Sequence, residues 1–413
     1  MPSFASTLCS LTLTALFSLL FASTEAVSLP SCQSAAPPQA TLTTVSTTIL
    51  NVSGSPFGVE FATHQKDTAF VTLSATRRSM LAVLNTSSFT PTLSHQIALP
   101  AAYGAAAGVT LSHDGKQLYI ASGPGLIVVD TKLAAVGSAT AIIGTLNGTT
   151  STQQPGRTGA IEVTLSRNNK YAFVSQEYGA NATNGLGNID VFELAHHAKN
   201  NTVTGTPVGF ANLGLEVVGS ALGPRGDFLY ATAENETNSV NDTVMGYLNV
   251  LDVAKLKNNP SEALLRQVEA GCGPVRVIIS SDGNIVWMTA RESNHLLAFN
   301  ATRLQSKHPD QYEDALIESV QVGTSPVGLA FVKNETRILT ADSNRFGTSG
   351  NATSSVSVVD VQAALSGVGQ PVLGRVPAGS FPREVAVSPD GNTVLVADYD
   401  SRQVQAIDVR TLP

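Results

Sequence analysis

A unit that recurs every 50–57 residues constrains the fold of this chain more than any other feature. The clearest copy is the last one, 379–412, in which a Gly-x-x-Pro segment leads into three short apolar runs separated by turn residues. The turn between the first two runs is Pro389-Asp390-Gly391, and an Asp-Gly pair between apolar runs favours a β-hairpin. Each copy is therefore predicted to form a meander of three β-strands, A, B and C.

The unit occurs seven times between about residue 54 and the C-terminus. Each copy can be anchored on the second residue after the proline, or on its equivalent where the proline is absent; these anchors are Gly58, Gly108, Glu162, Gly219, Arg276, Gly328 and Glu384. A long period with several short strands per copy indicates a β-propeller rather than a helical solenoid.

A fourth apolar run, strand D, precedes the Gly-x-x-Pro segment of each following copy, as in 264–271 and 372–378. The chain starts its β pattern with an unpaired run of this type, 40–52, and stops after a C strand. Pairing these two ends would remove an open sheet edge. We therefore predict an all-β fold, a seven-bladed β-propeller of four-stranded antiparallel blades spanning 40–413, with the N-terminal strand completing the last blade.

The third strand of every copy ends on a short polar acceptor. Such side chains hydrogen-bond the backbone two residues further on and so stabilise a turn. The seven residues are Asn85, Asp130, Glu193, Asp252, Asn300, Asp360 and Asp408.

The first 26 residues are interpreted as a signal peptide, followed by an N-terminal tail over 27–39. The apolar run 8–22 has the length of a signal-peptide core and is followed by small residues at 24 and 26. A membrane anchor is the alternative, but the run is short for a bilayer span. Ten N-glycosylation motifs agree with a secreted glycoprotein; they lie at Asn51, Asn85, Asn147, Asn181, Asn200, Asn235, Asn241, Asn300, Asn334 and Asn351.

The charge and the cysteine content limit the classes of binding partner that this chain is expected to have. The formal net charge is −7, and the chain has few basic clusters, so nothing in it favours nucleic acid or anionic membranes. Without the leader the chain keeps Cys32 and Cys272, which either form a disulfide or leave Cys272 as a small buried residue. Two cysteines cannot build a Cys-rich zinc site. A monomer that binds a small molecule, a glycan or an extracellular protein is expected.

Strand direction sorts the loops onto two faces. Because A, B, C and D alternate in direction, the D–A connections and the B–C loops share one face, which we call the loop face. The A–B hairpins and C–D links form the opposite, hairpin face. The longest insertions, 178–188, 234–246 and 343–355, fall on the loop face. Long loops on a rigid scaffold are frequent binding sites, although glycosylated insertions can also be merely tolerated.

The anchor position offers candidate site residues. Four copies carry glycine there, but Glu162, Arg276 and Glu384 are charged, and Arg383 lies beside the last. Charges seldom line a closed interior unless they are paired or face water. These residues therefore predict a polar central site in which Arg276 orients an acidic group and a glutamate acts as acid or base. The alternative is a ring of salt bridges that joins the blades.

Residues just past strand B form a second set of ligand-binding candidates on the same face, and each has a solvated loop charge as its alternative. They are Glu177, Arg291, His295, Asp342 and Asp398. The sequence has no HExxH motif, no Cys/His cluster, no G-x-S-x-G elbow and no phosphate-binding glycine loop before a helix. No metal and no cofactor are predicted.

The motifs resemble a known family. The unit G-x-x-P-x-x-V-x-x-S-P-D-G, followed by strands such as 118–122 (LYIAS) and 394–398 (VLVAD), is similar to the YVTN-type repeats of seven-bladed lactonase-like propellers. The resemblance covers nearly all of the chain after the leader. It implies a metal-independent central site of Arg, Glu and His groups, but no clear histidine joins Glu162, Arg276 and Glu384 here.

Two functions stay open at this stage. One is a secreted propeller that binds a ligand or partner through its loop face and central mouth without catalysis. The other is a lactonase-like hydrolase or cyclase acting on a small acidic cyclic ester, with Arg276 orienting the substrate and Glu162 or Glu384 activating water.

Overall fold

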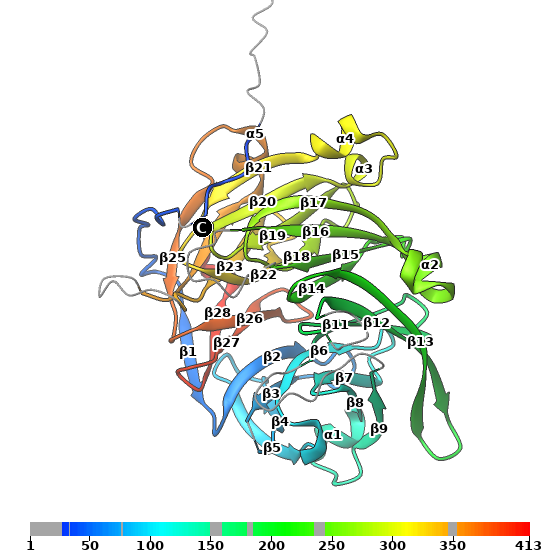
Figure 1. Ribbon diagram of the computed structural model, residues 1–413. Coiled ribbons are helices and arrows are strands. Elements are labelled where there is room, and N and C mark those ends of the chain that lie inside the picture. The colour runs from blue at the N-terminus through cyan, green and yellow to red at the C-terminus, as the bar shows by residue number, and fades with distance from the viewer. Residues whose placement is uncertain are drawn as a thin grey trace, which may run out of the picture.

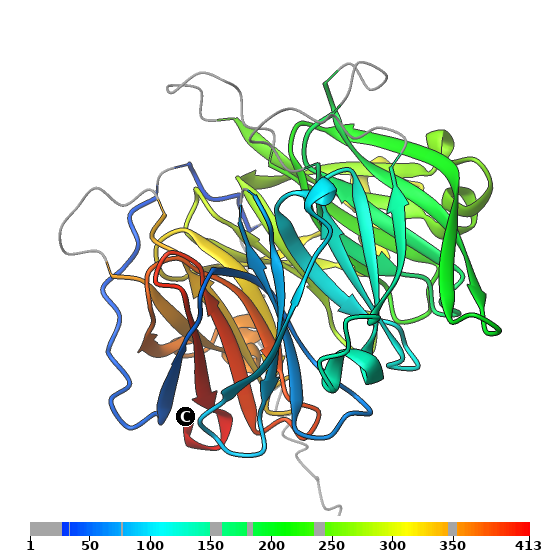
Figure 2. The same cartoon turned by 90° about the horizontal axis from the view of Figure 1, so that it is seen from below.

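The computed structural model describes residues 27–32, 34–75, 77–148, 159–179, 185–234, 244–345 and 353–413. Seven four-stranded antiparallel sheets surround a central axis (Figures 1 and 2). The innermost strands contact one another in the order β2, β6, β10, β14, β18, β22 and β26, and β26 returns to β2. The predicted fold class, an all-β seven-bladed propeller, is confirmed.

Each blade runs outward from the axis as strands A, B, C and D. Blades 1 to 3 hold β2 (Ser55–Phe61), β3 (Thr68–Ser74), β4 (Met80–Asn85) and β5 (Thr92–Ala98); β6 (Ala106–Leu111), β7 (Gln117–Ser122), β8 (Gly125–Asp130) and β9 (Ile142–Asn147); and β10 (Ala160–Leu165), β11 (Tyr171–Gln176), β12 (Gly187–His197) and β13 (Thr202–Gly214). Blades 4 and 5 hold β14 (Val217–Leu222), β15 (Phe228–Ala233), β16 (Met245–Asp252) and β17 (Leu264–Cys272); and β18 (Pro274–Ile279), β19 (Ile285–Ala290), β20 (His295–Asn300) and β21 (Leu316–Gln321). Blades 6 and 7 hold β22 (Pro326–Val332), β23 (Arg337–Asp342), β24 (Ser355–Asp360) and β25 (Val372–Pro377); and β26 (Pro382–Val387), β27 (Thr393–Asp398), β28 (Gln403–Asp408) and β1 (Thr47–Asn51).

The ring closes as predicted. Strand β1 pairs antiparallel with β28, from Thr47 opposite Ile407 to Asn51 opposite Gln403. The last blade therefore has three strands from the C-terminus and one from the N-terminus. The strand is shorter than the predicted run 40–52, because 40–46 runs along blade 6 before it reaches blade 7.

The hairpin turns repeat one side-chain arrangement. In the last copy the Ser388 hydroxyl donates to Asp390 at 2.6 Å, and the N–H of Thr393 donates to the Ser388 oxygen at 2.9 Å. Gly391 has φ +71°, in the left-handed region that glycine adopts without strain. The same Ser-x-Asp/Asn geometry recurs at Ser112 and Ser280, so these hairpins are set locally by sequence.

Short helices on the hairpin face begin at the polar ends of the C strands. Asp130 caps α1 and accepts a hydrogen bond from the N–H of Leu133, and Asp252 and Asp360 do the same for α2 and α5. This is the usual role of Asp and Asn at a helix start. The helices are α1 (Thr131–Ala135), α2 (Val253–Asn258), α3 (Ala301–Leu304), α4 (Pro309–Glu313) and α5 (Val361–Ser366), with 3-10 turns η1 (Ala101–Tyr103), η3 (Pro260–Glu262) and η4 (Val409–Thr411).

The segment before β1, described over 27–32 and 34–46, is an ordered strap along blades 4 to 6. It begins at a disulfide between Cys32 and Cys272, at the end of β17, with the two Cα atoms 5.4 Å apart. Further on, the Gln39 side-chain oxygen lies 2.9 Å from the Ser357 hydroxyl, and the N–H of Leu42 donates to the Arg375 carbonyl at 2.8 Å. The strap thus connects blade 4 to the closing strand of blade 7.

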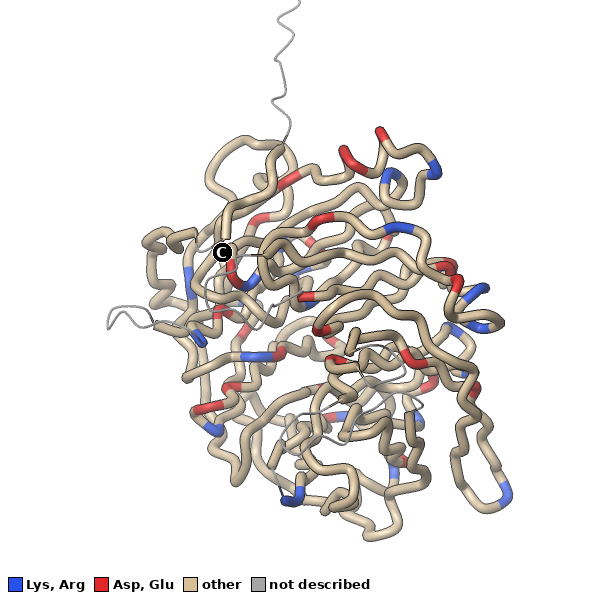
Figure 3. The backbone as a smooth tube through the Cα atoms, in the orientation of Figure 1, with Lys and Arg blue, Asp and Glu red and all other residues tan. Residues whose placement is uncertain are grey.

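Charge is spread over the ring. Figure 3 shows acidic and basic residues interspersed along the tube instead of segregated on one side.

Across the described ranges no helix is long and apolar enough to cross a membrane. The predicted signal peptide, 1–26, lies outside the described residues.

Candidate functional site

The anchor residues lie on the seven innermost strands, where these strands crowd together around the axis. A Cβ atom placed on Gly219 would lie 2.2 Å from the Val275 carbonyl oxygen of the next blade, and one on Gly108 would lie 2.7 Å from that of Ile161. Both distances are far below normal contact. Glycine is therefore required at these anchors because the neighbouring backbone occupies the space of a side chain.

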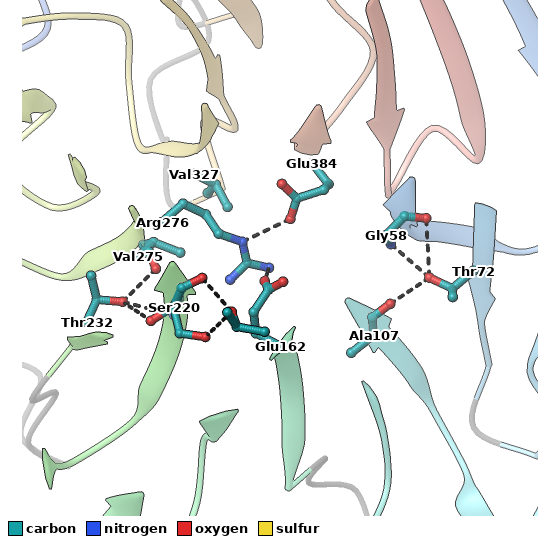
Figure 4. Close-up of polar contacts among 12 residues, drawn as sticks. Gly58, Thr72, Ala107, Glu162, Ser220, Thr232, Val275, Arg276, Val327 and Glu384 are labelled. Carbon is teal, nitrogen blue, oxygen red and sulfur yellow. Dashed lines mark hydrogen bonds and ion pairs between the residues drawn. The ribbon is translucent and has the colours of Figure 1, made fainter. Parts of the chain in front are cut away.

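Threonine hydroxyls join the inner strands of neighbouring blades (Figure 4). The Thr232 oxygen accepts from the N–H of Gly219 at 2.9 Å, and its hydroxyl donates to the Val275 carbonyl at 2.7 Å. Thr72 and Thr289 make equivalent contacts in blades 1 and 5. These contacts satisfy backbone groups at the strand bulges and hold the anchor level rigid.

The three charged anchors meet across the channel (Figure 4). Arg276 of β18 donates through Nε to Glu384 of β26 at 2.9 Å, and its Nη2 lies 3.3 Å from an oxygen of Glu162 on β10. The Arg276 side chain is 6% exposed and each glutamate 17%. We call this group the channel triad. It joins blades 3, 5 and 7, which were predicted to carry these charges.

Burial and charge act in opposite directions on the triad. Burial raises the pKa of Glu162, Arg276 lowers it and Glu384 raises it again, so that it reaches about 7. Burial lowers the pKa of Arg276, but the carboxylates of Glu384 and Glu162 outweigh burial and hold it above its ordinary value. Arg276 is therefore a permanent cation with two carboxylate partners.

A third carboxylate, Glu60 on β2, was not among the predicted site residues. It faces a cavity of about 290 Å³ that lies on the hairpin side of the triad. The cavity is lined by Val59, Glu60, Val109, Thr110, Glu162, Glu384, Val385, Ala386 and Val387. Burial, then Glu384 and Glu162, raise the pKa of Glu60 to about 8. A signal was present, because Glu60 lies two residues after its anchor, where the other copies carry uncharged residues.

Arg383 lies on the loop side of the triad against aromatic rings. Its Cζ is 3.7 Å from the centroid of Phe57 and 5.3 Å from that of Phe381, with Tyr399 at 5.7 Å. Such contacts stabilise a guanidinium. Burial, followed by repulsion from Arg276, lowers its pKa to about 10. Arg383 was predicted as a ligand-binding candidate, but its aromatic neighbours were not predicted.

Glu177 and Arg291 also lie toward the loop side. Burial raises the pKa of Glu177 against the pull of Arg383. Arg291 forms a buried bidentate salt bridge with Glu234, in which Nη1 lies 3.2 Å from one carboxylate oxygen and Nη2 lies 2.7 Å from the other. Glu234 was not among the predicted residues, and this pair is a structural bond between the ends of blades 4 and 5.

The other predicted residues lie away from the channel, between blades or at their edges. Asp342 is buried and accepts hydrogen bonds from the hydroxyls of Thr340, Ser355 and Ser357 at 2.6–3.0 Å. Asp398 is buried beneath the D–A connection of blade 7. His295 contacts the Ser293 carbonyl through Nδ1, and burial lowers its pKa. Asp342 and His295 thus make structural contacts.

Metal ligands do not gather in the part of the chain that the structure describes, where no group of three His, Cys, Asp or Glu residues is arranged to hold an ion. The site therefore consists of the channel triad, Glu60 and the adjoining cavity, with Arg383 and its aromatic neighbours above.

Comparison with known proteins finds similarity in the fold and not in the sequence. No family model matches the chain, and no curated protein matches it. A chain of Kuenenia stuttgartiensis hydrazine synthase is similar over 88% of this chain and 98% of its own, with a TM-score of 0.62 and 14% identity. A chain of a mitotic checkpoint complex is similar over 91% and 98%, with a TM-score of 0.58 and 14% identity. The likeness shows the seven-bladed propeller fold.

Proposed function

We propose that this chain is a secreted, glycosylated binding propeller that holds a small organic cation in its central channel. The observation that carries the proposal is the imbalance of charge around the channel cavity. Glu60, Glu162 and Glu384 line the cavity, and Arg276 is the guanidinium that pairs with two of them. Ionised carboxylates in a confined space repel one another, and a ligand ammonium group would relieve that repulsion.

In the absence of a bound cation, protons neutralise the carboxyl groups of the channel. The raised pKa values of Glu60 and Glu162, about 8 and about 7, mean that these carboxyls hold protons near neutral pH. A bound ammonium would displace them. Binding should therefore release protons and become tighter as the pH rises.

Secretion and glycosylation are supported by the leader-like N-terminus and by the positions of the glycosylation motifs. Asn51, Asn85, Asn147, Asn200 and Asn334 are exposed, and Asn300 is half-buried. Asn85 accepts the N–H of Ser87 through Oδ1, which leaves the amide nitrogen, where a glycan attaches, directed elsewhere. The other four motifs, at Asn181, Asn235, Asn241 and Asn351, lie outside the described residues.

Lactone chemistry is not proposed. The expected role of Arg276 was to orient an acidic substrate, but its guanidinium already pairs with both glutamates that were expected to act as acid or base. A carboxylate substrate would have to displace one of these partners.

Calorimetric titration with propylammonium and tetramethylammonium chloride tests the proposal. The affinity should rise roughly tenfold per pH unit between about pH 6.5 and 7.5. The reason is that a ligand that displaces one proton on binding has a binding constant that increases tenfold for each unit of pH. Glu60→Gln should weaken binding and reduce this pH dependence, whereas Glu313→Gln, at an exposed surface carboxylate, should change neither. Sodium acetate is the anionic control. Binding of acetate, or equal ammonium binding by Glu60→Gln and the parent protein, would contradict the proposal.

A further inference from the structure

Asp398 is a buried carboxylate with an unusual lack of hydrogen-bond donors. It ends β27 and has no exposed surface. Within the described part of the chain, its side-chain oxygens have no hydrogen-bond partner apart from the backbone N–H of Gly379, which approaches the carboxyl group. Buried polar groups are almost always paired, and an ionised carboxylate without donors is especially costly.

Gln405, on the neighbouring strand β28, has the matching deficiency. Its Nε2 donates to the Pro377 carbonyl at 2.9 Å, and since a carbonyl can only accept, this contact fixes which end of the amide is oxygen. The Oε1 atom is buried and has no donor among the described residues. Gln405 is 3% exposed.

The two side chains lie on the same face of blade 7. Val396 and Ile407 pack against blade 6 with Val356 and Val358. Asp398 follows Val396 by two residues and Gln405 precedes Ile407 by two, so alternation along the strands turns both toward blade 6. Both also meet the 377–379 segment, since Gln405 bonds Pro377 and an Asp398 oxygen is 2.7 Å from the position of a Cβ on Gly379.

Blade 6 shows how the same position is satisfied when donors are present. There Asp342 receives three hydroxyl hydrogen bonds, from Thr340, Ser355 and Ser357. The corresponding residues of blade 7 are Val396, Gln403 and Gln405, which replace three hydroxyl donors with an apolar group and two amides. The amide nitrogen of Gln403 is directed at Asn51, and that of Gln405 at Pro377.

We propose that Asp398 is held as the neutral acid beneath the D–A connection of blade 7, where its hydroxyl donates to Gln405 and fastens residues 379–384. The proton supplies the donor that the Gln405 oxygen lacks. Its loss would leave a buried carboxylate that faces the Gln405 oxygen, with the Gly379 N–H as its donor, beneath the segment that carries Phe381, Arg383 and Glu384. The acid is therefore a pH-sensitive latch for one wall of the central site.

The electrostatic surroundings agree with this assignment. Burial raises the pKa of Asp398 to about 7, and the backbone of Gly379 opposes the shift. Blade 6 presents apolar side chains such as Val356 and Val376 to this face, and β28 presents Gln403 and Gln405. No ionisable side chain of the described chain contributes to the shift.

Hydrogen–deuterium exchange of the peptide covering 377–384, corrected for intrinsic rates, tests the latch. In the parent protein its protection should be greatest below about pH 4, the ordinary pKa of an aspartate, fall by up to tenfold per pH unit from there to about pH 7, and level off above that pH. Asp398→Asn should stay protected throughout, because its amide donates to Gln405 at every pH. Asp342→Asn, the matched change in blade 6, should leave the pH response of 377–384 unchanged.

Infrared spectroscopy provides a second readout that does not depend on local opening. At pH 6 the difference spectrum of the parent minus Asp398→Asn should contain the carbonyl stretch of one protonated carboxyl group. The absence of that band, or the same pH profile of exchange in Asp398→Asn and the parent, would overturn the proposal and indicate that an ordered water satisfies an ionised Asp398.

Discussion

At the scale of single residues, the anchor position shows how one site in a repeat serves two purposes. Where the residue is glycine, as at Gly219, the next blade's carbonyl occupies the space of a Cβ. Glu162 and Glu384 instead pair directly with the neighbouring strand, and their side chains reach the channel. Packing density excludes side chains at the glycine anchors, and strand register admits the two glutamates. Arg276 lies at a strand bulge like that of Gly219, and its side chain is held by its two carboxylate partners.

Substituting Gly219 by alanine tests the packing argument. The added methyl would meet the Val275 oxygen at 2.2 Å, and we expect a loss of about 1–3 kcal/mol or more in the free energy of unfolding, as for other overpacked interiors. Urea denaturation measures it. Gly223→Ala, in the same blade, is the control, because its Cβ would lie 3.4 Å from its nearest neighbour and should cost little. Equal stability of the two variants would show that the backbone yields easily at the anchor.

At the scale of elements, the strap and β1 close the ring. Strand β1 pairs with β28 over five residues. This short ladder is the junction where the two ends of the propeller meet. The disulfide between Cys32 and Cys272 holds the far end of the strap on blade 4. It thereby restricts the unfolded chain over a separation of 240 residues.

Breaking the disulfide should therefore destabilise the whole ring. For Cys32→Ser we expect a loss of about 2–5 kcal/mol, the usual range for a native disulfide, seen as a lower melting temperature in calorimetry. A reductant should lower the melting temperature of the parent protein and leave that of Cys32→Ser unchanged. If the parent melts at the same temperature with and without reductant, the strap does not contribute to closure.

At the scale of the whole molecule, the channel triad ties together blades that are not neighbours. Arg276 reaches Glu162 and Glu384 from blade 5 to blades 3 and 7. A buried ion pair gives little net stability over apolar packing, but removing one partner leaves unpaired charge. The same group forms the wall between the cavity with Glu60 and the aromatic side with Arg383.

Arg276→Met should accordingly destabilise the protein by about 3–5 kcal/mol near pH 8, because it leaves the two glutamates without their buried counter-charge. Adding Glu162→Gln and Glu384→Gln should recover most of the loss, because the triple variant contains no unpaired charge. Chemical denaturation at pH 8 and pH 5 compares them. The loss should shrink at pH 5, because Glu162, whose pKa is raised to about 7 mainly by burial, is then protonated and uncharged. A triple variant as unstable as the single one would mean that Arg276 acts through packing alone.

The sequence by itself determined the period, the strands, the hairpin turns and the closure by an N-terminal strand, because all of these depend on short-range patterns such as Ser388-Pro389-Asp390-Gly391. It also placed Glu162, Arg276 and Glu384 at one level. Their pairing, the addition of Glu60 and the separation of Asp398 from the channel were decided by tertiary structure. The direction of a side chain around the axis depends on the strand bulges and on which blade lies next, and no single copy of the repeat contains that information.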